Sequence, residues 1–407
     1  MTVASAAQAP PLPATRREFQ PGSTAVALIV ALAAWTLSAS FGWRLAALFL
    51  VGTAAGLVLY HAAFGFTSAW RIFIADGRGE GLRAQMLLLA LTCAVFFPLL
   101  ASGQAFGMRL NGSVQPVGLP VVIGAFMFGV GMQLGGGCAS GTLFSVGGGS
   151  LRMLLTLAAF VVGSVAATAH STFWGSLPSW RPASLVASFG PVPALALSLA
   201  VFGAIFIGTV VVERRRFGRL VDAPLPAAGP HWLHGPWPLV AGAVGLMLVN
   251  LATLLLAGRP WGVTGAFALW GAKAARAFGV PVETWPYWSS PGQLAALDGS
   301  AFGDVTTVMD GGIVLGALLA ALLAGRFKPV WAVPPRSAAA AILGGLLLGY
   351  GARVAYGCNI GAYFSGIASG SLHGWLWLPS AFIGSALGTS LRPWFGLSVE
   401  RSHLPRC

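Results

Sequence analysis

Long apolar segments are the feature of this sequence that most limits what it can fold into. A helix needs about 20 apolar residues to cross the ~30 Å hydrocarbon core of a bilayer. The chain has 407 residues, of which 56% are hydrophobic and only 8% are charged, too few for the surface of a soluble fold. The sequence therefore predicts an all-α membrane protein that crosses the bilayer many times. Its apolar runs lie near residues 23–40, 44–64, 85–101, 117–135, 151–170, 193–212, 237–257, 305–325, 338–352 and 374–391.

The net charge of +13 comes largely from arginines at the ends of these apolar runs, as in residues 213–216 and 326–328. Basic residues in this position follow the positive-inside rule and predict orientation. Nucleic acid is not expected as a partner, because its binding needs a basic patch that follows phosphates. Arg16 and Arg17 are not followed by a short apolar core with a cleavage site, so we expect a cytoplasmic N-terminal tail and no cleaved signal.

Two halves of the sequence resemble each other on either side of a charged, proline-rich stretch, residues 213–236. Single glycine matches are common in such a sequence, but ordered matches that include two cysteines are not, so we infer an internal duplication. Its gapless core aligns Gly129, Gly131, Gly137, Cys138, Gly141, Phe144 and Ser145 with Gly349, Gly351, Gly357, Cys358, Gly361, Phe364 and Ser365.

The duplication and the charges together predict how the chain is organised. Loops 102–116 and 326–336 occupy corresponding places in the two halves, yet the first is expected outside and the basic second inside. The repeats are therefore predicted to be inverted, with broken helices meeting at a central constriction. The expected parts are a cytoplasmic tail (1–22), a first transmembrane repeat plus extra helices (23–212), a cytoplasmic linker (213–236), a second inverted repeat (237–392) and a C-terminal tail (393–407).

The segments GGGCASG (135–141) and YGCNIG (356–361) each place a cysteine inside a glycine cluster. Each glycine costs a helix roughly 1 kcal/mol relative to alanine, so both segments are predicted to break. Irregular backbone at membrane depth must be buried in protein or line a wet cavity. A fresh helical turn after each break directs N–H groups into the gap, which favours an anion. Cys138 and Cys358 are therefore predicted to meet at one anion pathway.

The predicted pathway consists of two cysteines, the glycines beside them and one arginine. An S–H group is a weak donor on a soft sulfur atom, which suits a substrate that exposes sulfur and must bind only weakly. The arginine either attracts an anion or extends to the membrane interface. These residues are Cys138, Cys358, Gly136, Gly137, Gly141, Gly357, Gly361 and Arg353.

Two other interpretations of the cysteines stay open. Small residues are common packing devices between membrane helices. Helix N-termini also lower the pKa of a thiol. In the other interpretation the protein is therefore a membrane thiol enzyme or sulfur carrier, in which Cys138 and Cys358 form a persulfide or a disulfide. Cys93 has no counterpart in the other half and is expected to pack, and Cys407 ends the chain without an expected role. No cofactor or metal is expected, since no Cys/His cluster has metal-ligand spacing.

The remaining polar candidates rank lower. Lys273, Arg276 and Asp310 lie in or near apolar stretches and are expected to be helix-end anchors more than cavity-facing groups. Thr67 and Thr264 occupy matched short pieces at 65–80 and 261–280, where a hydroxyl either donates to a substrate or satisfies the backbone at a helix break.

The paired Gly-Cys segments, with RPWGVTGAFALWGAK (259–273) and VMDGGIVLGALLAA (308–321), resemble the YeeE/YedE family of bacterial inner-membrane proteins over about residues 45–392. The resemblance implies an inverted-repeat fold, uptake of thiosulfate or a related sulfur anion without enzymatic activity, and a small cytoplasmic sulfurtransferase of the YeeD/TusA type as a partner. It implies that Cys138 and Cys358 line the route. Thiosulfate transporters of the family carry a third functional cysteine nearer the start of the chain, but no cysteine precedes Cys93 here.

Overall fold

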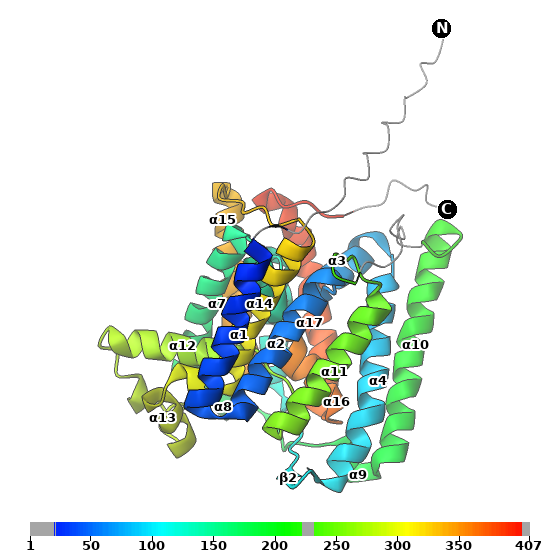
Figure 1. The fold of residues 1–407 in the computed structure, drawn as a ribbon. Helices are drawn as coiled ribbons and strands as arrows, with labels where there is room; N and C mark the ends of the chain where they lie inside the picture. The colour runs from blue at the N-terminus through cyan, green and yellow to red at the C-terminus, as the bar shows by residue number, and fades with distance from the viewer. Residues whose placement is uncertain (1–19, 21, 222–231, 401–407) are drawn as a thin grey trace.

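The computed structural model describes residue 20 and residues 22–221 and 232–400. In this part of the chain, nine helical stretches are long and apolar enough to cross a membrane. Figure 1 shows long helices running side by side in one bundle, so the predicted all-α polytopic fold is confirmed. The long helices of these nine stretches are α1 (Gly22–Phe41), α2 (Trp43–His61), α4 (Glu80–Ser102), α5 (Leu119–Gly135), α7 (Leu151–Ala169), α10 (Pro191–Phe217), α11 (Leu239–Ala257), α14 (Val305–Leu323) and α15 (Pro335–Val354). A further long helix, α17 (Leu372–Leu391), packs against α5 and is not among the nine.

Short elements connect the long helices or break them. The strands form two antiparallel pairs, β1 with β2 and β3 with β4. The pieces expected to be too broken to span form two short helices, α3 (Phe66–Asp76) and α12 (Thr264–Ala277). The others are α6 (Ala139–Gly147), α8 (Ser171–Ser176), α9 (Leu185–Phe189), α13 (Pro291–Asp298), α16 (Ser365–Ala368), the 3-10 helices η1 (Val282–Thr284), η2 (Ala301–Gly303) and η4 (Arg392–Phe395), the π-helix η3 (Asn359–Phe364), and β1 (Gln104–Ala105), β2 (Met108–Arg109), β3 (Val117–Gly118) and β4 (Ser179–Trp180).

Helices of the two halves pack against each other in exchanged pairs. In chain order, α2, α3, α4, α5, α6 and α7 correspond to α11, α12, α14, α15, α16 and α17. α2 packs on α14 and α4 on α11; α5 packs on α17 and α15 on α7; α3 packs on α17 and α12 on α7. For each of these contacts, the corresponding helices of the opposite halves also pack on each other. A twofold relation between the two halves requires this pairing. The inversion of the repeats stays a prediction.

Glycines let these helices touch backbone to backbone. A Cβ atom added at Gly129 of α5 would overlap the carbonyl oxygen of Ala381 in α17, and one at Gly349 of α15 would overlap the carbonyl oxygen of Phe160 in α7. Small residues at such crossings allow the close approach that drives helix association in membranes. The matched glycines of the duplication therefore hold the two halves together.

Replacing Gly349 by alanine is expected to destabilise the protein by about 2 kcal/mol or more, because the methyl group forces α15 away from α7. The measurement is the midpoint of thermal unfolding in detergent. Gly208→Ala is the matched control: Gly208 lies on α10 with no atom within 4 Å of its Cβ position, so helix propensity alone acts there. Equal midpoints for Gly349→Ala and the control would contradict this packing.

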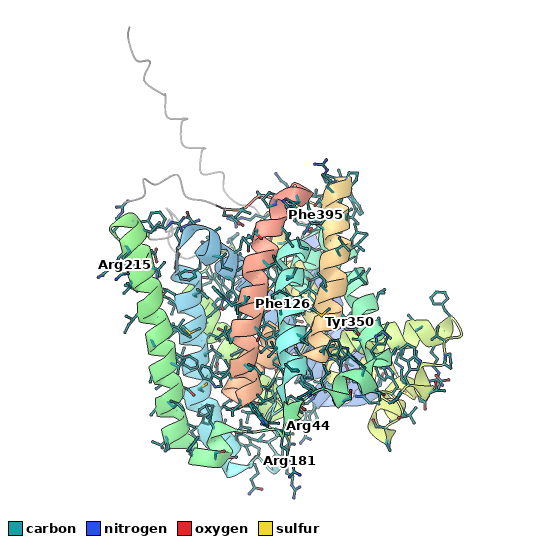
Figure 2. The ribbon with its side chains drawn as sticks, turned by 180° about the vertical axis from the view of Figure 1, so that it is seen from behind. Arg44, Phe126, Arg181, Arg215, Tyr350 and Phe395 are labelled. Atoms are coloured by element: carbon teal, nitrogen blue, oxygen red, sulfur yellow. The ribbon has the colours of Figure 1, made fainter. Side chains whose placement is uncertain are left out.

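The two ends of the bundle carry different residues. Figure 2 shows Arg215 and Phe395 at one end and Arg44 and Arg181 at the other. The loop that contains β2 lies at the Arg44 end, whereas α14 and α15 are joined at the Arg215 end (Figure 1). Loops 102–116 and 326–336 thus lie at opposite ends, as expected from the charges. Which end faces the cytoplasm stays a prediction.

The helices expected outside the repeats lie at the periphery. In the apolar segment of α1, and likewise of α10, only 17% of the residues are buried inside the protein, whereas 67% are buried in that of α14. α10 also continues to Phe217, into the stretch expected to be a linker, because the buried Glu213 pairs with Arg83. Residues 1–19 of the expected N-terminal tail, 222–231 of the linker and 401–407, with Cys407, lie outside the described residues.

Candidate functional site

The first predicted break is confirmed. After α5 ends at Gly135, Gly136 turns the chain with a φ of 93°, and α6 begins at Ala139. Cys138 is the N-cap of α6: its Sγ atom accepts a hydrogen bond from the Gly141 amide at 3.4 Å. The thiol is therefore directed at the N-terminal end of a fresh helix, as the glycine cluster predicted.

The second predicted break is also confirmed, with a different geometry. After α15, Tyr356 has a φ of 59° and Gly357 a φ of 152°, and η3 starts directly after Cys358. The Cys358 carbonyl accepts a hydrogen bond from the Ala362 amide at 2.8 Å. A Cβ at Gly357 would lie only 2.8 Å from that same amide nitrogen, so only glycine fits this loop.

The two breaks lie beside each other inside the bundle. Helix α6 contacts η3, and the two thiols lie within electrostatic range of each other. We call the two loops, residues 135–141 and 356–361, the waist. The waist is closed, because the exposed fractions of Cys138 and Cys358 are 2% and 0%.

A polar pocket of about 360 Å³ opens beside the Cys358 loop; we call it the outer pocket. Its wall includes Arg353, Gly357 and Gly361 from the predicted set and Thr264 from the lower-ranked candidates. It also includes Arg259, which sequence reasoning missed because a basic residue between two apolar runs is typical of an orientation signal. The wall of the outer pocket thus contains two arginines together with the glycines of the Cys358 loop.

Neither arginine of the outer pocket is neutralised. Arg259 donates to the Thr306 hydroxyl at 3.3 Å, and Arg353 donates to the Tyr287 hydroxyl at 2.5 Å. The Arg353 Nε–H is buried without a partner. Within the described residues, neither guanidinium forms a salt bridge, so the pocket has two positive charges available to an anion.

Three more arginines surround the other break; Arg71, Arg152 and Arg392 form what we call the inner arginine group. Arg152 donates to the carbonyls of residues 134 and 135 at 2.6 and 2.7 Å. Arg71 and Arg392 both bind Gln133, the counterpart of Arg353, through its side-chain and backbone oxygens. The guanidiniums lie within electrostatic range of one another. Sequence reasoning missed this group, because its members are far apart along the chain.

The inner arginine group already holds one anionic group, the Glu400 carboxylate. Its two oxygens accept from Arg71 at 2.5 and 2.6 Å, the only salt bridge of this group in the described part of the chain. Burial works against ionisation of Glu400, but the Arg71 guanidinium lowers the pKa of the carboxyl below its usual value. Among the described residues, this one carboxylate is the only anionic group paired with the three arginines, so this break also has positive charge in excess.

Several buried donors near the Cys358 break have no hydrogen-bond partner. The Asn359 amide, the Tyr363 hydroxyl and the Trp377 indole N–H are 0% exposed and unpaired among the described residues. Tyr363 and Trp377 stack with their ring centres 6.2 Å apart. Unpaired buried donors are rare in native proteins because each costs free energy. These donors suit a polar ligand beside the Cys358 break.

Of the lower-ranked charged residues, two act as anchors between helices and one is buried inside a helix. Lys273 donates to the backbone carbonyls of residues 297 and 299, and Arg276 pairs with Asp298, so both hold α13 to α12. The helix-end interpretation of Asp310 is wrong: it lies inside α14 and is 0% exposed. Cys93 is buried in α4, with its Sγ atom 3.8 Å from the Ile367 carbonyl, where it packs between the halves.

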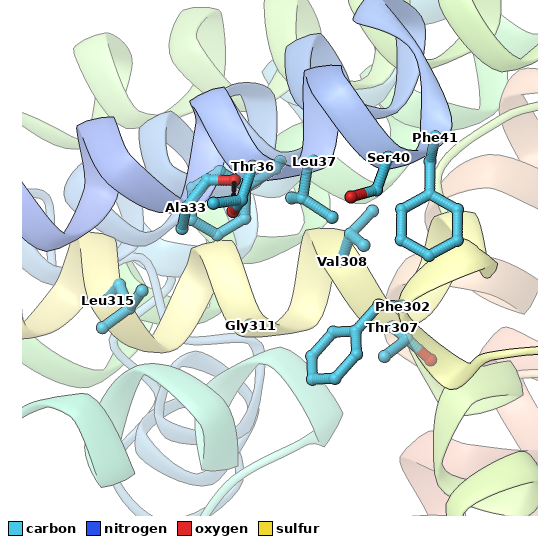
Figure 3. Close-up of a pocket in the computed structure, with 11 residues that line it drawn as sticks. Ala33, Thr36, Leu37, Ser40, Phe41, Phe302, Thr307, Val308, Gly311 and Leu315 are labelled. Carbon is cyan, nitrogen blue, oxygen red and sulfur yellow. Dashed lines mark hydrogen bonds between the residues drawn. The ribbon is translucent and has the colours of Figure 1, made fainter.

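A second pocket differs in character from the outer pocket. It lies between α1 and α14, has a volume of about 370 Å³, and is lined by apolar residues, a few hydroxyls and a glycine, without any charged side chain. Figure 3 shows Leu37 and Phe41 of α1 facing Val308 and Gly311 of α14 across it. Such a wall does not suit an anion. Within the described residues, no group of three His, Cys, Asp or Glu side chains could hold a metal ion.

Comparison with known proteins places the chain in a family. The family described as "Sulphur transport" matches residues 61–387. The "Thiosulfate transporter TsuA" of Spirochaeta thermophila is 29% identical over 354 residues, 80% of this chain and 92% of that protein. The protein of the same name from Escherichia coli is 25% identical over 82% of this chain and 91% of its own length.

A match over a shorter part of the chain has a higher sequence identity. The "Probable transporter YedE" of Escherichia coli is 34% identical over 174 residues, so the chain spans 42% of the length of that relative. The family match, in contrast, covers both broken segments and the linker between them. The chain therefore belongs to the sulphur transport family. These are the YeeE/YedE proteins, which its two Gly-Cys segments already resembled.

Proposed function

We propose that this protein takes up thiosulfate or a related small sulfur-containing anion across the bacterial inner membrane, along a path lined by Cys138 and Cys358. The observation that carries the proposal is the outer pocket, where two unneutralised guanidiniums, Arg259 and Arg353, stand beside the Cys358 loop. The relatives named as thiosulfate transporters support the same substrate class.

The path has positive charge at both ends and soft, neutral donors in the middle. The anion enters the outer pocket, attracted by its two arginines. It then crosses the waist, where the S–H groups of Cys138 and Cys358 and the unpaired Asn359 amide replace its hydration. It leaves towards the inner arginine group. Weak contacts at the waist keep the anion from being trapped.

Passage requires a small opening, because neither thiol is accessible in this state. Gly141 and Gly361 have room beside them: the nearest atoms to a Cβ at these positions are at 3.4 and 4.0 Å. Gly136, Gly137 and Gly357 instead shape the loops, two of them with positive φ. Local movement of the loops about these glycines opens the waist without moving whole helices.

The proposed orientation follows the charges. The Arg215 end, with the inner arginine group, faces the cytoplasm together with both termini, and the outer pocket faces the periplasm. The two repeats, 23–212 with extra helices and 237–392, are then inverted about the waist, with 213–236 as a cytoplasmic linker. A small cytoplasmic sulfurtransferase of the YeeD/TusA type would receive the anion beside the inner arginine group.

Burial of both thiols argues against the alternative, a thiol enzyme or sulfur carrier. A carrier must present its sulfur atom to a partner protein, but both thiols are buried inside the bundle. Cys138 Sγ is engaged by the Gly141 amide and lies 3.4 Å from the Ser140 hydroxyl. Transport uses such buried thiols as contacts, without a lasting chemical change.

The test is uptake of radiolabelled thiosulfate by cells that lack their own sulfate and thiosulfate transporters and express this chain. Uptake above that of cells with an empty vector is expected, with competition by unlabelled thiosulfate and not by chloride. Absence of uptake at normal membrane expression would contradict thiosulfate as the substrate. Labelled selenium and other sulfur oxyanions would then be compared in the same cells.

A further inference from the structure

Asp310 is a buried acidic side chain that the proposed path does not yet use. It lies on α14, 0% exposed, and neither of its carboxylate oxygens has a hydrogen-bond partner among the described residues. The helix cap is formed by another residue, Asp304, whose carboxylate accepts from the Thr307 amide at 2.8 Å. Asp310 therefore has no capping or pairing role that would explain a carboxyl group at this depth.

The position of Asp310 along α14 places it between the outer pocket and the waist. Residues four apart lie on one face of a helix. Thr306, four residues before Asp310, lines the outer pocket. Val314, four residues after it, contacts Gly147 of α6, the short helix that Cys138 caps. Asp310 also lies within electrostatic range of Cys358. Its side chain is thus beside the route proposed for the anion.

The groups packed around Asp310 provide no neutralising charge at contact distance. The segments of α1, α2 and α6 that pack against α14 carry no charged side chain, with Arg44 and His61 only at the two ends of α2. On α12, Lys273 is bound to carbonyls near α13. Arg259 binds Thr306, one helical turn away, and Asp304 adds a like charge.

An ionised carboxylate in this position is costly for two reasons. Burial of an unpaired charge is strongly unfavourable, so the group takes up a proton. An anion at the waist would also repel the carboxylate through a low-dielectric interior. The anion and the proton therefore favour each other's binding, and linkage makes this effect reciprocal.

Building on the proposed function, we propose that Asp310 is the proton-binding site that couples anion uptake to proton entry. The side chain takes a proton from the outer pocket, which lets the anion enter the waist beside a neutral acid. After the anion leaves on the other side, the carboxyl group releases its proton in the same direction. Net uptake then carries protons with the anion, whereas one-for-one exchange of anions does not.

The experiment uses the purified full-length protein in liposomes that contain a pH-sensitive dye. Counterflow of labelled for unlabelled thiosulfate without a pH gradient tests the function, and net uptake with an acidic exterior tests the coupling. For the wild type we expect the accumulation of thiosulfate in the lumen to rise up to tenfold per unit of imposed pH difference, together with acidification of the lumen. Asp310→Asn should retain counterflow but lose both pH effects, and Asp310→Glu should keep them.

The outcomes separate the two claims. Absent counterflow in the wild type would contradict thiosulfate transport, whereas wild-type counterflow with net uptake indifferent to pH would overturn the role of Asp310. Folded Asp310→Asn that stays proton-coupled, or that loses counterflow as well, would also overturn it. Infrared spectra provide a readout that needs no substrate: the carbonyl band of a buried protonated acid should be present in the wild type and missing in Asp310→Asn, and identical spectra would overturn the proposal.

Discussion

Leucine at position 361 is expected to block uptake while the protein folds normally. Gly361 lines the outer pocket beside the Cys358 loop, and the nearest atom to its Cβ position is Gly262 Cα at 4.0 Å. There is therefore room for a Cβ atom at this position, and we expect a leucine side chain to extend into the pocket and fill it beside the Cys358 loop. Raising a barrier by about 1.4 kcal/mol already slows a step about tenfold, and an obstructed path raises it further.

The matched control is Gly361→Ala, which adds one methyl group where there is room for it. It should retain most of the uptake of the wild type, and both variants should elute from a sizing column as the wild type does. The measurement is initial uptake of labelled thiosulfate at equal membrane expression. A Gly361→Leu protein that transports at the wild-type rate would show that the outer pocket is not on the route.

Removing the two guanidiniums of the outer pocket is expected to weaken the apparent affinity for the anion. Two unit charges 4 Å apart interact by roughly 4 kcal/mol at an effective dielectric constant of 20, and an open pocket screens much of this. About 1.4 kcal/mol for each arginine gives a rise in KM of about tenfold for Arg259→Gln or Arg353→Gln, and about a hundredfold for both. Because screening acts on these charges, added salt should raise KM less in the double variant.

Arg181→Gln is the matched control for charge at the same end of the bundle. Arg181 is exposed and lies at that end, but it does not line the outer pocket. Its loss should leave KM close to that of the wild type. If Arg181→Gln raised KM as much as the pocket variants, general surface charge and not the pocket would attract the anion.

Most of the fold could be predicted from the sequence, because length and hydrophobicity decide which segments can cross a bilayer. The run at 193–212, for example, falls within α10 (Pro191–Phe217). The boundary of α10 was missed because its last turn is charged, and the buried Glu213 is acceptable there because the distant Arg83 neutralises it and the amides of Gly79 and Val221 donate to it. A partner 130 residues away cannot be read from local composition.

The site was predicted only where local backbone chemistry defines it. The glycine clusters around Cys138 and Cys358 predicted both breaks, because glycine disfavours a helix regardless of its surroundings in the fold. The arginines around these breaks, such as Arg259 and Arg152, were missed because arginines at the ends of apolar runs are also the normal orientation signal. Asp310 was misjudged for a related reason: its depth depends on the N-cap at Asp304, which is visible only in the folded helix.

The most direct test of the central claim compares thiosulfate uptake by the wild type, Cys138→Ala, Cys358→Ala and Cys93→Ala in cells without their own sulfate and thiosulfate transporters. Cys93 is an equally buried cysteine away from the waist and controls for loss of a thiol as such. We expect uptake to be lost in both waist variants at normal membrane expression and retained in Cys93→Ala. Wild-type uptake by Cys138→Ala and Cys358→Ala would contradict a path lined by the two thiols.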